Sequence, residues 1–397
     1  MFVKLIQEFT ENIEGLNEFV NSIEPLLIEK QSKFINENSS LFIPLLQAIG
    51  NKKNGIKDEI EVEIVSGKSK THYNFSSKQF DENFYEVFNK FNRNDNHIKL
   101  LYKNSLISLL SSVEWFFSQI LHTYYNKFPN ASGIKKKSLT FEELKRFESI
   151  EEAEKYLIDQ KIEGILRSSF NDWLELLIKE FSLKINLLIS EKDEINEIYQ
   201  RRNLLVHNGG LVNTIYLSKV EKKYAENLTL SDRIDVDSKY LENSISKLHI
   251  NFLLLTTELW QKIEPESPYI LTILVQTSYQ YFSDKKYSIA LQVCKYIEEY
   301  KSDNDEVKTF NKILLSFIFI KLDLETEAQE IIKNINITNS NSFSKLGYFS
   351  LVNDTEKFLT ELPIAIKKGE FLLDFLDENP LFENISKNID IQNFLNK

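Results

Sequence analysis

"IKLLYKNSLISLLSSVEWFFSQILHTYY", residues 98–125, is the most regular stretch of the chain and decides its fold class. Its apolar side chains recur at steps of three and four residues, the spacing that places them on one face of an α-helix. They are Ile98, Leu101, Tyr102, Leu106, Leu109, Leu110, Val113, Phe116, Phe117, Ile120, Leu121 and Tyr124. The stretch therefore predicts a long amphipathic helix that ends near Pro129.

Helical patterns continue on both sides of this stretch. We expect further helices over residues 2–22, about 150–160, 161–189, 191–208 and 240–262. Thr140 and Glu143 have the spacing of a capping box, which marks a helix start. Alternating residues around Ser66-Gly67-Lys68 predict a β-hairpin. We therefore expect a mainly α protein in which residues 1–95 form a small α+β region and residues 96–264 an up-and-down helical bundle.

The sequence changes character after Pro265 and Pro268, so we expect a domain boundary there. In residues 265–397, three segments each combine a helical pattern, a polar turn and a second helical pattern: residues 281–293, 320–332 and 349–362. Aligning Ala290, Ala328 and Phe358 gives intervals that average about 34 residues, the period of tetratricopeptide repeats. The C-terminal region thus resembles a tetratricopeptide-like array, although other arrays of helical hairpins have a similar period.

Composition limits the class of protein. The chain is 42% hydrophobic and 27% charged and has only 10 glycines and 7 prolines, which favours long helices. The single cysteine, Cys294, excludes an intrachain disulfide framework and a cysteine-rich zinc site, and we expect it to be buried and inert. Trp115, Trp173 and Trp260 are expected to be core or packing residues. We predict no metal and no cofactor.

Charge and hydropathy indicate where the protein is located and which partners it can bind. The N-terminus mixes acidic residues into its apolar ones and lacks a signal-peptide pattern. The apolar runs fall short of the about 18 residues that span a bilayer, so we expect a cytoplasmic protein with no membrane partner. A net charge of −11 argues against a protein that coats DNA by bulk electrostatics. It leaves room for RNA chemistry at a small local site.

Residues 201–210, RRNLLVHNGG, concentrate residue types that are scarce elsewhere in the chain. On a helix, Asn203 and His207 share one face because they are four residues apart, and an asparagine there can orient the imidazole. Leu204, Leu205 and Val206 are expected to anchor the helix in the core. Asn208-Gly209-Gly210 predicts the end of the helix, because glycine adopts the left-handed conformation without strain.

This arrangement suits acid-base chemistry on a phosphodiester. Histidine can give or take a proton near pH 7, so His207 is a candidate general acid or base. The Arg202 guanidinium can neutralise charge that develops on a phosphoryl oxygen. Such a pair suits RNA cleavage in which the ribose 2′-hydroxyl attacks its own phosphodiester. An arginine and a histidine at a helix end are also common, however, and either can simply pair with Glu194 or Glu197.

Arg202, Asn203, three further residues and His207 match the pattern of HEPN domains, which is arginine, a polar residue and a histidine after four to six intervening positions. A long preceding helix with an internal acid, Glu114, and a glycine-containing exit followed by Tyr216 extend the similarity. Residues 96–264 therefore resemble a HEPN domain.

The resemblance implies a metal-independent endoribonuclease of the kind found in toxin-antitoxin, abortive-infection and antiviral defence systems. It implies that Arg202 and His207 are the catalytic pair, that Asn203 positions them, and that two copies dimerise into one composite cleft. Our own additions are Arg201 and Asn208 as substrate-binding residues and Glu114 and Tyr216 as support. In a dimer, two Arg201-Arg202 pairs would gather positive charge at one seam, which would let an acidic protein bind RNA.

Two alternatives stay open. The first is a catalytically silent HEPN bundle that holds a nucleotide or RNA, with the C-terminal repeats as a protein-interaction scaffold. The second is a toxin restrained by a partner enzyme that modifies Tyr216 or a neighbouring residue. In each case we expect the C-terminal repeats to bind a protein partner or regulator.

Overall fold

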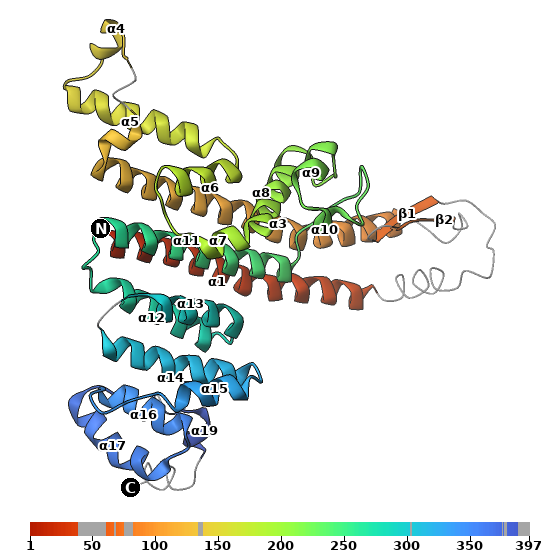
Figure 1. Ribbon diagram of the computed structural model, residues 1–397. Coiled ribbons are helices and arrows are strands. Elements are labelled where there is room, and N and C mark those ends of the chain that lie inside the picture. The colour runs from red at the N-terminus through yellow and green to blue at the C-terminus, as the bar shows by residue number, and fades with distance from the viewer. Residues whose placement is uncertain are drawn as a thin grey trace. The chain divides into compact units, whose positions relative to one another are not determined.

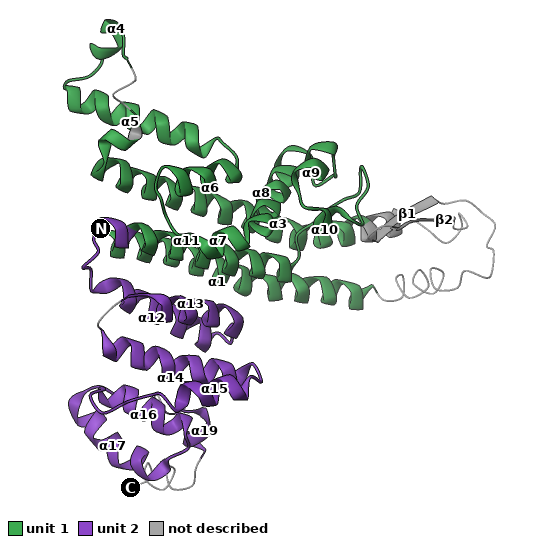
Figure 2. Cartoon of the chain, viewed as in Figure 1, with its two compact units in different colours: residues 1–259 green, residues 260–397 purple. Residues whose placement is uncertain are grey.

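The computed structural model describes residues 1–38, 61–66, 69–74, 82–133, 138–301, 304–374, 376 and 379–387. These residues are mainly helical, as expected, and two strands are described (Figure 1). The chain divides into two compact units, residues 1–259 and residues 260–397 (Figure 2). None of the helices in the described ranges combines the length and apolar character needed to cross a membrane.

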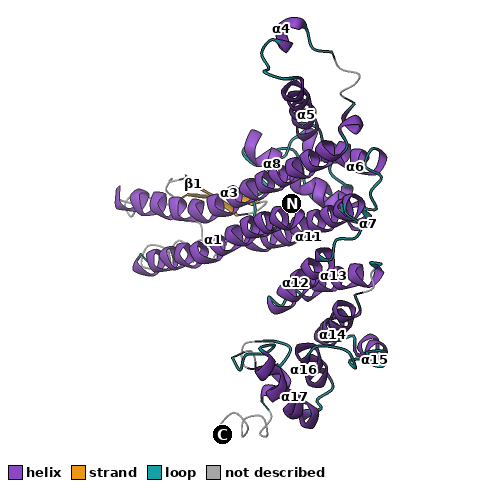
Figure 3. Cartoon of the chain, turned by 90° about the vertical axis from the view of Figure 1, so that its left-hand side faces the viewer, coloured by secondary structure: helices purple, strands orange, loops and turns teal. Residues whose placement is uncertain are grey.

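Three long helices form the centre of the first unit: α1 (Phe2–Glu37), α3 (Glu82–Lys127) and α11 (Ser238–Ile263). They run alongside one another, and Figure 3 shows the three from a second side. The Phe9 ring of α1 stacks on Phe116 of α3 with centroids 3.9 Å apart, and Thr10 is hydrogen-bonded to His249 of α11. Helix α1, which we assigned to a separate N-terminal region, therefore packs within the first unit.

The amphipathic pattern of residues 98–125 is confirmed as part of α3. Its apolar face is fully buried from Leu106 to Leu121, and the helix ends at Lys127, two residues before Pro129. The helix also begins earlier than predicted, at Glu82. Helix α1 is also longer than the predicted 2–22. It continues through Pro25 to Glu37, even though a proline inside a helix removes one backbone hydrogen bond.

The N-terminal region also contains the strands β1 (Glu61–Ser66) and β2 (Ser69–Asn74), which pair antiparallel with Ser66 opposite Ser69. The predicted turn residues Gly67 and Lys68 lie outside the described residues. Residues 134–137, which include Lys135, Lys136 and Lys137, also lie outside them.

Shorter helices complete the first unit. The capping box is confirmed: the Thr140 hydroxyl accepts from the Glu143 backbone N–H, and the Glu143 carboxylate accepts from the Thr140 N–H. The prediction of one helix over residues 161–189 is wrong, because a second capping box at Ser169 starts a new helix. The observed helices are α4 (Phe141–Leu144), α5 (Ile150–Leu166), α6 (Phe170–Lys179), α7 (Asn186–Ser190), α8 (Lys192–His207), α9 (Thr214–Lys219) and α10 (Lys222–Ala225).

The second unit consists of helical hairpins. Each of the three predicted segments is a helix, a polar turn and a helix, and each turn contains one residue with positive φ: Lys285, Asp323 or Asn353. The apolar run 313–319 of α14 is buried, and so is Cys294. The helices are α12 (Tyr269–Ser283), α13 (Tyr287–Glu299), α14 (Asp305–Lys321), α15 (Glu325–Ile332), α16 (Ser342–Leu351), α17 (Thr355–Lys368) and α19 (Glu383–Ser386).

Candidate active site

The motif lies at the C-terminal end of α8, and the two glycines end the helix as predicted. Gly209 and Gly210 have φ of 61° and 85°, and the Gly210 N–H donates to the Leu204 carbonyl at 3.1 Å. The Gly210 carbonyl accepts from the Ile234 N–H at 2.8 Å. A Cβ on Gly210 would lie 2.7 Å from the Ile234 carbonyl oxygen, so this close approach requires glycine.

Leu204 and Leu205 are buried, which confirms that they anchor the helix. The same prediction is wrong for Val206, which is 46% exposed. Consecutive helical residues are rotated by about 100°, so three in a row cannot all face one core. Val206 and the following residue, His207, are both exposed at the surface of the first unit.

Arg202 crosses from α8 to α3. One of its terminal nitrogens, Nη2, donates to the Glu114 carboxylate, and the two side chains are 23% and 31% exposed. The guanidinium lies 6.0 Å from the centroid of the Tyr199 ring. Burial raises the pKa of Glu114, and the charge and hydrogen bond of Arg202 only partly oppose this. The structure thus brings together two of the predicted residues, Arg202 and Glu114.

Two polar atoms beside this pair lack a partner. In the part of the chain that the structure describes, Arg202 Nε and the Tyr199 hydroxyl are buried and make no hydrogen bond. Tyr199 itself is held by aromatic packing, with its ring 5.5 Å from Phe170 and 5.6 Å from Trp173. Buried polar groups are normally hydrogen-bonded, so these two atoms have spare capacity for water or a ligand.

Arg201 belongs to a different cluster. Its Nε–H donates to Glu197 at 2.8 Å, its Nη1 donates to the Asp235 carbonyl at 3.1 Å, and its guanidinium lies 3.9 Å from the centroid of the Tyr240 ring. The Tyr216 and Tyr240 hydroxyls each donate to Glu197 at 2.6 Å. Arg201, predicted to bind substrate, therefore joins α8, α9 and α11 through the buried Glu197 carboxylate.

The pKa shifts of the groups around Glu197 are consistent with a structural role for this cluster. Burial and the nearby Glu197 carboxylate raise the pKa of both Tyr216 and Tyr240. Burial lowers the pKa of Arg201, but Tyr240, Glu197 and Tyr216 together raise it above its ordinary value. The hydroxyls of Tyr216 and Tyr240 and the guanidinium of Arg201 therefore keep their protons at neutral pH. Tyr216, predicted as support, donates to Glu197 and lies near Arg201, and among the described residues no hydrogen bond joins it to Arg202.

His207, Asn203 and Asn208 complete the predicted set. His207 is exposed in the last turn of α8, and no hydrogen bond or ion pair joins its imidazole to another described residue. Asn203 is half-buried, and among the described residues no side-chain hydrogen bond links it to His207. The Asn208 amide donates to the Leu211 carbonyl at 2.5 Å, so in this structure it stabilises the turn after the helix.

The sequence named Glu197 as a possible partner of Arg202 or His207, but in the structure it pairs with Arg201, four residues later on α8. Sequence reasoning missed Tyr240. Tyr240 lies on another helix, and no local pattern indicates its contact with Arg201. Trp115, expected to be a core or packing residue, is 38% exposed beside Glu114 and is therefore not a core residue.

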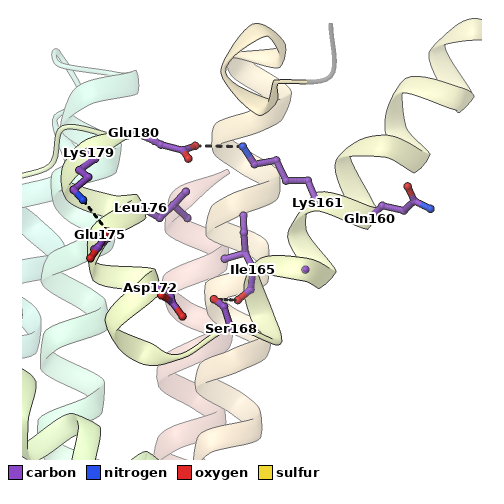
Figure 4. A pocket seen from close by; sticks show the side chains of 10 residues that line it. Gln160, Lys161, Ile165, Ser168, Asp172, Glu175, Leu176, Lys179 and Glu180 are labelled. Atoms are coloured by element: carbon purple, nitrogen blue, oxygen red, sulfur yellow. Dashed lines mark hydrogen bonds and ion pairs between the residues drawn. The ribbon is translucent and has the colours of Figure 1, made fainter. Parts of the chain in front are cut away.

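A separate hollow of about 510 Å³ lies between α5 and α6 (Figure 4). Two of its lysines are paired with carboxylates: Lys161 with Glu180 at 3.2 Å and Lys179 with Glu175 at 2.8 Å. None of the residues of the α8 motif lines it. Both lysines are therefore paired, and the Asp172 carboxylate caps α6 by accepting from Ser169.

Comparisons with protein families, with curated proteins and with solved structures give no match to this chain. The geometry of the described residues therefore carries the functional argument.

Proposed function

We propose that the protein is a metal-independent endoribonuclease of the HEPN type, with Arg202 and His207 as the catalytic pair. The observation that carries the proposal is their placement at one helix end: His207 is exposed, and Arg202 is partly exposed and fixed by Glu114. An exposed imidazole can reach a substrate proton, and a guanidinium held by a carboxylate is oriented in advance.

The chemistry follows from the two side chains. His207 takes the proton of a ribose 2′-hydroxyl, whose oxygen forms a bond to the adjacent phosphorus while the bond from phosphorus to the 5′-oxygen breaks. A protonated imidazole gives a proton to the leaving 5′-oxygen. Arg202 neutralises the charge that builds up on the phosphoryl oxygens. The products are a 2′,3′-cyclic phosphate and a 5′-hydroxyl.

Glu114 is compatible with this role for Arg202. A guanidinium has five N–H donors, and Glu114 accepts from one of its terminal nitrogens. The Nε–H is buried, so the donors left for a substrate are those of the terminal nitrogens. Arg202 can therefore bind a phosphoryl oxygen while Glu114 still holds it. Because Arg201 is committed to Glu197, Arg202 is the arginine of the pair that we assign to substrate.

The proposal includes a homodimer through the helical bundle, because one imidazole cannot serve as base and acid at the same moment and a second copy supplies the other. The proposed biological role is that of a toxin or effector in antiviral defence or abortive infection, with a protein partner or regulator bound by the C-terminal hairpins. Sedimentation of the purified protein with and without RNA tests the assembly, and a strictly monomeric protein contradicts the composite cleft.

A second candidate is a catalytically silent bundle that binds RNA or a nucleotide. The observation in its favour is the Arg202–Glu114 pair, since a guanidinium already bound to a carboxylate also serves the fold alone. A restraining modification at Tyr216 gains no support, because that hydroxyl is buried on Glu197. A modifying enzyme would reach it only after α9 had moved.

The test uses purified full-length protein and RNA in the presence of EDTA, beside Arg202→Ala and His207→Ala. The proposal expects cleavage by the wild type and its loss, by at least about a hundredfold, in His207→Ala. Glu194→Ala is the matched control, because Glu194 lies on the same helix and pairs with Lys247 away from the motif. Equal behaviour of wild type and both variants would favour the silent bundle.

A further inference from the structure

Trp115 differs from the other tryptophans of the chain. Trp173 and Trp260 are each 2% exposed, whereas Trp115 is 38% exposed on α3. The described residues provide no aromatic or cationic partner for its ring. A large apolar ring left partly in water is costly, and it is available to stack on a ligand.

Trp115 lies on the face of α3 that carries the candidate site. Ser111, Glu114, Trp115 and Ser118 are spaced at steps of three and four residues, so they form one continuous face of the helix. Glu114 on this face holds Arg202. The indole therefore belongs to the residue that follows Glu114 on α3, and Glu114 holds the Arg202 guanidinium, which comes from α8.

The charge of this face is also compatible with binding of an anionic polymer such as RNA. Between Asn104 and Asn126, Glu114 is the sole residue with a lysine, arginine, aspartate or glutamate side chain, and Arg202 pairs with it. The rest of the exposed face is neutral and polar, with Ser108 and Ser111 among its exposed residues. In a chain of net charge −11, such a face does not repel a phosphodiester backbone.

We propose that Trp115 is a stacking platform for an unpaired nucleobase next to the phosphate held by Arg202, so that the substrate is single-stranded RNA. This inference rests on the proposed function. In a duplex each base is stacked on its neighbours and paired, and only an unpaired base can turn onto an aromatic side chain. Aromatic stacking tolerates any base, and sequence preference at this position is therefore weak.

The test measures binding separately from cleavage. All proteins carry His207→Ala, so that the RNA stays intact, and a single-stranded RNA oligonucleotide is compared with the same sequence as a duplex. Iodide quenching isolates the exposed tryptophan, because Trp173 and Trp260 are buried. The inference expects the single strand to protect Trp115 from iodide and the duplex to leave it accessible.

Substitutions of Trp115 measure how much its ring contributes to RNA binding. Trp115→Ala is expected to weaken single-strand binding about tenfold or more, and Trp115→Phe to retain part of the affinity because it keeps an aromatic ring. Tyr269→Ala, which removes an exposed aromatic ring of the second unit, is the matched control and should leave Kd unchanged. Unchanged urea unfolding of Trp115→Phe shows that the fold is intact.

Three results overturn the inference in distinguishable ways. If Arg202→Ala weakens binding and Trp115→Ala leaves it within about twofold, the platform is wrong and the proposed function stands. If protection of Trp115 from iodide grows with protein concentration in the absence of RNA, a second copy covers this face. If no RNA binds to any of the proteins, the proposed function fails together with the platform.

Discussion

Arg201 and Arg202 are adjacent in the chain, but their guanidinium groups bind different carboxylates on different helices. Arg201 pairs with Glu197 within α8 and lies over the Tyr240 ring of α11, whereas Arg202 pairs with Glu114 of α3. The Glu197 side chain is 2% exposed and that of Glu114 is 31% exposed. The first pair is therefore part of the core, whereas the second is partly exposed to solvent.

The two arginines should differ in what their removal costs. Arg201→Ala leaves the buried Glu197 carboxylate without its cation, which should lower the free energy of unfolding by about 3–5 kcal/mol. Arg202→Ala removes a partly exposed pair and should cost about 1 kcal/mol. Urea unfolding followed by circular dichroism measures both values. Equal losses for the two variants would contradict this division of roles.

The tyrosines that bind Glu197 should act as a unit. Tyr216→Phe and Tyr240→Phe each remove one hydrogen bond to a carboxylate, and each should cost about 1.5–3 kcal/mol of unfolding free energy. Because both hydroxyls share one acceptor side chain, the double variant should depart from additivity by about 0.5 kcal/mol or more. A double-mutant cycle from urea unfolding curves tests this, and strict additivity would argue against a shared cluster.

The glycines after α8 should tolerate alanine unequally. Gly209→Ala places a Cβ in open space, and its cost, about 1–2 kcal/mol, comes from the positive φ alone. Gly210→Ala has the same backbone cost and also brings a Cβ within 2.7 Å of the Ile234 carbonyl oxygen. Thermal unfolding should therefore show the lower Tm for Gly210→Ala. The reverse order would mean that the loop at Ile234 yields easily.

Glu114 should give stability a specific dependence on pH. Its folded-state pKa lies above the ordinary value of 4.5, because burial disfavours the carboxylate more than Arg202 favours it. Its contribution to the free energy of unfolding is therefore fully present below the unfolded pKa and is lost as pH rises through the folded pKa. The stability of wild type minus that of Glu114→Gln should fall as pH rises above the ordinary carboxyl pKa of 4.5. A difference that rises with pH would show that Arg202 outweighs burial.

Local patterns predicted the parts of the fold that depend on periodicity and on helix ends. The buried face of α3, the capping box at Thr140 and the glycine stop after His207 all follow from the identities of nearby residues. The break within residues 161–189 was missed because Ser169 lies in a stretch that remains helical on both sides.

Less of the candidate site than of the fold could be predicted from the sequence. The motif located Arg202 and His207, but nothing in the order of residues separates Arg201 from Arg202. Their different surroundings arise from Tyr240 and Glu114, which are distant in the chain and reach α8 only after the helices pack. Trp115 was expected to be a core or packing residue from its side-chain type alone, but it lies outside the buried apolar face of α3 and is exposed.

The most direct test of the central proposal is the chemical nature of the ends that the protein leaves on RNA in EDTA. Attack by the 2′-hydroxyl predicts 2′,3′-cyclic phosphate and 5′-hydroxyl ends, formed by the wild type and lost in His207→Ala. Ends carrying a 5′-phosphate and a 3′-hydroxyl, or cyclic phosphate ends formed equally by His207→Ala, would contradict the assignment of Arg202 and His207 as the catalytic pair.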